Sequence, residues 1–258
     1  MTEDADVQPP TAVAYGAHPS QYFEVHLPEG PGPHPVVVLI HGGFWRLPWD
    51  RTLMRPLAAD LVGRGYAAVN LEYRRLGEEG GGWPGTCEDV AAALRKLEEE
   101  PAGALDLQSV TLVGHSAGGH LALWVAHHTN VDVRLVVSQA GVVDLRAAVR
   151  DRLDEENGKP PAALEFLGEA ADDVYRAASP IEMPPLGPGV RQFLLHGDAD
   201  NRVPRQQSLD HAQTAQLAGD DVRLAAFTGM GHFELIDPEH ESWQVTLAEI
   251  AALPRPSR

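Results

Sequence analysis

A serine between two glycines stands where an apolar run meets a helix-forming run, at residues 110–121. The pattern Gly114-His-Ser116-Ala-Gly118 is typical of a strand that turns sharply into a helix, with the serine Oγ exposed at the turn. The two glycines leave room where a Cβ atom would clash. A serine hydroxyl is a weak nucleophile at its ordinary pKa, so a histidine must take its proton and a carboxylate must orient that histidine. The sequence therefore predicts a nucleophilic Ser116 with two partners later in the chain.

Two carboxylates compete for the role of the acid. Asp198 and Asp200 lie in the segment 196–204, where an apolar run passes into a polar loop. Both follow the serine, as the chain order nucleophile, acid, histidine requires. Asp198 could instead tighten the turn by bonding to a nearby backbone N–H. From their positions alone, either Asp198 or Asp200 could be the acid.

His232 is the candidate base. It stands in Thr228-Gly-Met-Gly-His232-Phe, after the last predicted strand and before the last predicted helix. A single histidine is more often a surface or packing residue. Its place after the serine and the two aspartates, at the end of a strand, favours a catalytic role.

A glycine-rich loop at residues 41–45, His-Gly-Gly-Phe-Trp, follows an apolar run at residues 36–40. The tetrahedral intermediate of acyl transfer needs backbone N–H groups that stabilise its oxyanion. We expect these donors to be the amides of Gly43 and Phe44, together with the amide of Ala117 after the nucleophile. The alternative is an ordinary glycine turn, which the presence of the serine motif disfavours.

Three side chains near these motifs are candidates for substrate binding: Trp45, Trp83 and His115. Aromatic side chains commonly line small-molecule pockets, although they also simply pack. No pair of residues has the spacing of a His-x-x-x-His or Cys–His metal site, so we expect no metal and no cofactor. Cys87 has acidic neighbours that disfavour a thiolate, and we interpret it as a packing residue.

Composition excludes several classes of partner. The chain has 258 residues and a formal net charge of −17, which disfavours binding to nucleic acid or to an anionic membrane surface. No apolar run approaches the roughly 20 residues of a transmembrane helix, and the acidic N-terminus is unlike a secretory signal. With a single cysteine, no internal disulfide can form. We expect a soluble, cytoplasmic protein that acts on a small molecule.

Strands and helices alternate along the chain, which predicts an α/β fold with a mostly parallel sheet covered by helices on both faces. The predicted strands cover residues 22–27, 36–40, 66–71, 110–113, 133–137, 192–195 and 222–227. The predicted helices cover about 53–63, 90–100, 117–128, 204–218 and 238–251, the last with Asp237 as N-cap and Pro238 as its first residue.

We expect one domain over residues 21–258, after a polar leader of weak structure at residues 1–20. Residues 145–189 interrupt the alternation, and we interpret them as a cap-like insertion over the active site. A long solvated connection is the alternative. Exposed edge strands leave a homodimer possible.

The motifs together resemble the α/β-hydrolase superfamily over about residues 21–253. His-Gly-Gly-Phe-Trp at 41–45 with Gly-His-Ser-Ala-Gly-Gly-His-Leu at 114–121 is similar to the esterase and arylformamidase (kynurenine formamidase-like) branch. The segment 196–204 resembles the acid loop of the superfamily, and this resemblance implies that Asp200 rather than Asp198 is the acid. It also implies an α/β-hydrolase fold and supports His232 as the base.

The resemblance implies a serine hydrolase of small carboxylic esters or N-formyl arylamides. The segment Ala178-Ser-Pro-Ile181 also resembles prolyl-oligopeptidase-like relatives, so a peptidase of short peptides is an alternative. A non-catalytic ligand receptor is another, because a fold does not fix a function.

Overall fold

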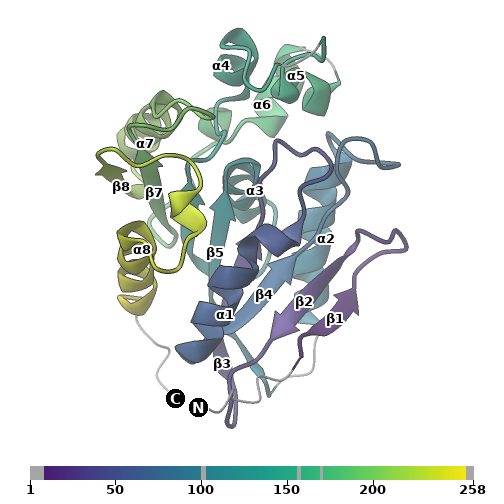
Figure 1. The fold of residues 1–258 in the computed structure, drawn as a ribbon, viewed down its shortest axis with the longest axis vertical. Coiled ribbons are helices and arrows are strands. Elements are labelled where there is room, and N and C mark those ends of the chain that lie inside the picture. The colour runs from purple at the N-terminus through teal and green to yellow at the C-terminus, as the bar shows by residue number, and fades with distance from the viewer. Residues whose placement is uncertain (1–8, 100–102, 156–157, 169–170, 254–258) are drawn as a thin grey trace.

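The computed structural model describes residues 9–99, 103–155, 158–168 and 171–253 (Figure 1). Its centre is an eight-stranded sheet in the order β1-β2-β4-β3-β5-β6-β7-β8. The strands are β1 (Thr11–Ala14), β2 (Tyr22–His26), β3 (His34–Ile40), β4 (Ala67–Leu71), β5 (Leu105–His115), β6 (Val133–Gln139), β7 (Arg191–Gly197) and β8 (Asp221–Phe227). β1 and β2 pair antiparallel, and β2 pairs antiparallel with β4. The pairings from β4 through β8 are all parallel.

Helices cover both faces of this sheet, as the sequence predicts. They are α1 (Arg55–Gly63), α2 (Gly85–Glu98), α3 (Ala117–Ala126), α7 (Gln206–Ala218) and α8 (Glu241–Ala251). Apolar side chains of α1 and α8 pack in one core with Val37 and Leu39 of β3. Those of α2, α3 and α7 pack in the other core with Val36 and Val38 of the same strand. Successive residues of a strand therefore contribute to opposite layers, which explains the unbroken apolar run of β3.

The predicted elements are present, but several boundaries differ. β5 begins at Leu105 rather than at residue 110, and α2 begins at Gly85 rather than near residue 90. The stretch predicted to have weak structure contains β1, which pairs with β2; residues 1–8 lie outside the described part. The last helix begins at Glu241 rather than at Pro238. Asp237 instead accepts a hydrogen bond from the amide of Glu239, so it closes a turn before the helix. α1 begins at Arg55 with Pro56 in its first turn, where a proline is tolerated.

Residues 145–189 form short helices grouped at one end of the molecule (Figure 1). They are α4 (Leu145–Arg150), α5 (Ala162–Leu167), α6 (Asp172–Ala178) and η2 (Pro180–Glu182). Across all the described residues, no helix combines the length and apolar character needed to cross a membrane.

Candidate active site

Ser116 occupies a strained turn between β5 and α3. Its backbone has φ 55° and ψ −119°, a conformation that a residue with a Cβ rarely adopts. The glycines beside it are required by close backbone contacts. A Cβ on Gly114 would lie 2.0 Å from the carbonyl oxygen of Gly118, and a Cβ on Gly118 would lie 2.0 Å from that of Ile40. The sharp turn predicted from Gly-x-Ser-x-Gly is therefore present.

His232 and Asp200 form a short hydrogen bond. The Nδ1–H of His232 donates to Oδ2 of Asp200 over 2.6 Å, which leaves Nε2 as the ring nitrogen able to accept a proton. The other oxygen of Asp200 accepts from the amides of Arg202 and Val203 at 2.8 and 2.9 Å. Burial pushes the pKa of Asp200 upward, but hydrogen bonds from His196 and His232 outweigh it and hold the pKa well below its ordinary value. Asp200 is therefore a fixed negative charge beside the imidazole.

Asp198 has a different partner. Its Oδ1 accepts a hydrogen bond of 2.7 Å from the amide of Gly229, at the start of the loop that carries His232. Asp198 thus ties the acid loop to the histidine loop. The bond observed for Asp198 therefore reaches across to another loop, in place of the local turn bond that the sequence suggested.

Ser116 and His232 line one pocket. The pocket is lined by Gly43, Phe44, Trp49, Leu53, His115, Ser116, Arg202, His232 and Phe233. The space open to the centre of a water molecule is only about 20 Å³, close to what one or two waters need. None of the described residues between 145 and 189 is among these lining residues.

The predicted oxyanion loop has an unusual backbone. Gly43, Phe44 and Trp45 have φ values of 108°, 50° and 57°, so three successive residues are left-handed. Only glycine adopts this region without strain, and such strain concentrates at functional sites. Gly43 and Phe44 line the pocket together with Ser116, as the sequence predicts.

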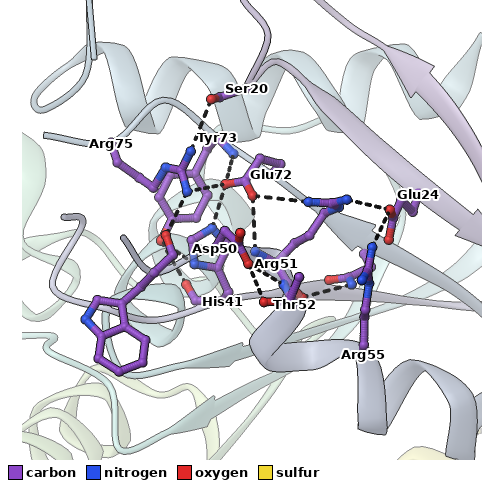
Figure 2. Close-up of polar contacts among 12 residues, drawn as sticks. Ser20, Glu24, His41, Asp50, Arg51, Thr52, Arg55, Glu72, Tyr73 and Arg75 are labelled. Carbon is purple, nitrogen blue, oxygen red and sulfur yellow. Dashed lines mark hydrogen bonds and ion pairs between the residues drawn. The ribbon is translucent and has the colours of Figure 1, made fainter. Parts of the chain in front are cut away.

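A buried polar network holds this loop in place (Figure 2). His41, the first residue of the loop, contacts Oε1 of Glu72 through Nε2 at 2.9 Å. The ring of Tyr73 stacks on that of His41 with centroids 4.2 Å apart, and its hydroxyl donates to the carbonyl of His41. Glu72 also accepts from the amide of Arg51. Burial alone would raise the pKa of Glu72. The hydrogen bond to His41 and the charge of Arg75 have a larger, opposite effect, so the pKa is lowered and the carboxylate stays ionised.

Two of the three predicted substrate-binding residues lie away from the pocket. Trp45 is fully buried and stacks on Phe166 of α5, with centroids 4.4 Å apart. Its left-handed backbone turns it into the core, a direction that residue type cannot reveal. Trp83 is half-buried and packs edge-on against Trp124 of α3. Trp45 and Trp83 therefore pack against neighbouring elements, the alternative to substrate binding for an aromatic side chain.

His115, the third, does line the pocket. Its Nε2–H donates to the backbone carbonyl of His232 over 2.9 Å. Burial, followed by the nearby His232, lowers the pKa of His115 to about 3. It is therefore a neutral ring that holds the backbone of His232 and adds no competing charge.

Sequence reasoning missed four lining residues: Trp49, Leu53, Arg202 and Phe233. Phe233 directly follows His232, and Arg202 lies two residues after Asp200, so closeness in the sequence was the available signal. Trp49 and Leu53 reach the pocket only because the chain after the oxyanion loop folds back over it. Cys87 is buried, and burial raises the pKa of its thiol well above the ordinary value, as expected of a packing residue.

Comparison with known proteins places this site in a family. A family model described as BD-FAE matches residues 23–214. The chain belongs to the BD-FAE family. This agrees with the esterase and arylformamidase resemblance of the motifs.

Two curated relatives and one solved structure illustrate the similarity. Esterase LipQ of Mycobacterium tuberculosis is 28% identical over 203 residues, 72% of this chain and 46% of LipQ, so the chain spans about half the length of that relative. Kynurenine formamidase of Drosophila melanogaster is 22% identical over 213 residues, 79% of this chain and 67% of that protein. A truncated carbohydrate esterase from gut microbiota is 21% identical with a TM-score of 0.80, covering 96% of this chain and 97% of that one. The fold is that of the α/β-hydrolases.

Proposed function

We propose that this protein is a serine hydrolase that cleaves small carboxylic esters or N-formyl arylamides through an acyl-enzyme. The observation that carries the proposal is the short Asp200–His232 hydrogen bond beside the strained turn of Ser116. In this arrangement His232 and the serine line the same pocket. A structural ion pair would need neither the strained serine nor the pocket.

The proposed reaction has two halves. Nε2 of His232 takes the proton from Ser116 as its Oγ attacks the substrate carbonyl, and the amides of Gly43, Phe44 and Ala117 stabilise the oxyanion. The imidazolium then gives that proton to the leaving alcohol or amine, and an acyl-serine remains. Water next attacks the acyl-serine with His232 as general base, which releases the acid and restores the serine. Asp200 stays ionised throughout and stabilises the imidazolium.

Two relatives support the two proposed substrate classes. Similarity to the Drosophila kynurenine formamidase supports an N-formyl arylamide as one substrate class. Similarity to LipQ supports an ester as the other.

The test uses a fluorophosphonate probe and two substrates, p-nitrophenyl acetate and N-formylkynurenine. We expect the wild type to be labelled at Ser116 and to hydrolyse at least one substrate. Ser116→Ala should lose labelling and lower kcat by on the order of 10⁶-fold, as in other serine triads. Equal slow hydrolysis by both proteins, with no labelling, would contradict the proposal and favour a non-catalytic receptor.

A further inference from the structure

Two large aromatic side chains at the mouth of the pocket are exposed. Trp49 and Phe233 are 38% and 44% exposed, and their ring centroids lie 6.3 Å apart. Both line the pocket that contains Ser116 and His232. Exposed apolar groups gathered beside a reactive centre are typical of a binding surface. We call this pair, Trp49 and Phe233, the aromatic shelf.

Each member of the aromatic shelf is fixed to one side of the site. Phe233 follows His232, and their rings are nearly perpendicular with centroids 5.3 Å apart. Trp49 packs on the oxyanion loop so closely that a Cβ on Gly43 would lie 2.2 Å from the Cβ of Trp49. The carbonyl of Trp49 also accepts a hydrogen bond of 2.8 Å from Arg75. The shelf is therefore held against both the proposed base and the proposed oxyanion donors.

The proposed reaction decides which part of a substrate reaches the shelf. His232 must give its proton to the leaving group, so the leaving group lies beside His232 and hence against Phe233. The leaving group must also depart so that water can take its place, which requires an open side. The exposed faces of Trp49 and Phe233 provide such an open side on the pocket that Ser116 and His232 also line.

We propose that Trp49 and Phe233 determine specificity by binding a flat aromatic leaving group. The inference rests on the proposed function, because it assigns the leaving-group side of that same site. An aryl or arylmethyl ring can pack on the exposed surfaces of both side chains at the centroid separations of about 4.5–7 Å that aromatic pairs prefer. The preferred substrates are then aryl or arylmethyl esters, or arylamides, of a small acid.

The experiment compares benzyl acetate with cyclohexylmethyl acetate. The two esters share their acyl group, and their alcohols have similar size and acidity, so aromaticity is the main difference. We expect kcat/KM to favour the benzyl ester about fivefold or more, the scale of one or two aromatic contacts. Trp49→Leu and Phe233→Leu should each move the ratio toward one. Because the ratio compares one enzyme with two substrates, a shift of the oxyanion loop in Trp49→Leu cancels. Leu217→Ala, which changes an 83% exposed residue of α7, is the control and should keep the ratio.

The outcomes separate this inference from the proposed function. A protein that is labelled by the fluorophosphonate and cleaves both esters with a ratio near one overturns the shelf but keeps the serine hydrolase. A wild-type preference that persists in both leucine variants also overturns the shelf. Absence of both labelling and ester cleavage removes the proposed function, and the shelf with it.

Discussion

At the scale of single residues, two aspartates separated by one residue have clearly different environments. Asp200 accepts hydrogen bonds from His232 and from two backbone amides. Asp198 accepts one from the amide of Gly229. An amide side chain can replace a carboxylate that only accepts from a backbone N–H. It cannot replace one that must stabilise an imidazolium. The two positions therefore offer a matched pair of isosteric substitutions.

We predict that Asp200→Asn lowers kcat by about 10⁴-fold, the scale known for this substitution in serine triads. The asparagine leaves the geometry largely in place but removes the charge and favours the wrong tautomer of His232. Asp198→Asn should keep kcat within about threefold, because the asparagine oxygen still accepts from the amide of Gly229. A threefold change in kcat corresponds to less than the roughly 1.4 kcal/mol of a tenfold change. Steady-state kinetics with p-nitrophenyl acetate measures both. Equal losses of kcat in the two variants would show that Asp200 has been wrongly assigned as the acid.

The sequence predicted the residue whose local backbone shape neighbouring glycines make possible, but not residues whose direction the fold decides. Ser116 was predictable because contacts at Gly114 and Gly118 exclude any Cβ, so the motif carries its own steric reason. Trp45 was not, because its left-handed φ of 57° sends the ring into the core, and residue type does not encode that direction. Trp49 was missed for a related reason: no motif surrounds it, and only the fold-back of its loop brings it to the pocket.

At the scale of elements, the segment 145–189 contacts the proposed oxyanion loop and the residue that follows it. Arg46, next in the chain after Trp45, is 8% exposed and donates to Glu165 of α5 and to Asp154 at 2.7 and 2.6 Å. It also donates to the backbone carbonyl of Pro160. The observed contacts of this segment therefore brace the strained loop, while its role as a cap over the active site stays a prediction.

We predict that Arg46→Met destabilises the fold by about 2 kcal/mol. Breaking a buried ion pair costs about 3–5 kcal/mol, and the partial exposure of Glu165 reduces that figure. The variant should also lower kcat, because the oxyanion loop loses its brace. Urea unfolding measures the first effect and p-nitrophenyl acetate kinetics the second. Arg146→Met is the control: this arginine of α4 makes exposed pairs with Glu182 and Asp172, so little change is expected. Equal stability of Arg46→Met and wild type would show that the brace does not contribute.

The elements themselves were predictable where burial set a pattern. Residues 36–40 of β3 form an unbroken apolar run because both faces of the sheet are covered there. β1 was missed because three of its four residues are exposed, so no such run marks it. The start of α8 was misplaced because Asp237 and Pro238 form a helix-like entry signal, while Asp237 bonds to Glu239 in a separate turn and His240 caps the helix by accepting from Ser242. Local capping chemistry cannot distinguish these two outcomes.

At the scale of the whole molecule, several histidines are buried as neutral rings. Burial lowers the pKa of His115 to about 3, and those of His120 and His211 to about 4. In the unfolded chain each would titrate near 6.5. Between pH 6.5 and 4 the unfolded state therefore binds more protons than the folded state, so the free energy of unfolding rises with pH in this window and falls as the solution is acidified. Asp200 affects stability in a lower pH range, because its lowered pKa changes the free energy of unfolding only as pH falls below the ordinary aspartate value of 3.8.

We predict that the free energy of unfolding falls by on the order of 5 kcal/mol between pH 7 and pH 5, with each of the three rings contributing about 2 kcal/mol. Since single domains have only about 5–15 kcal/mol in total, the urea midpoint should drop sharply over these two pH units. His211→Gln tests the cause: its amide can still donate to Gln192, the partner of His211 Nε2, but it does not titrate. The half-buried His127, whose pKa burial also lowers to about 4, adds a smaller contribution of the same sign. The variant should therefore lose between about one quarter and one third of the pH dependence and keep the rest. A wild-type midpoint that is equal at pH 7 and pH 5 would mean that these rings are not held neutral in the fold, and an unchanged slope in His211→Gln would remove that ring from the account.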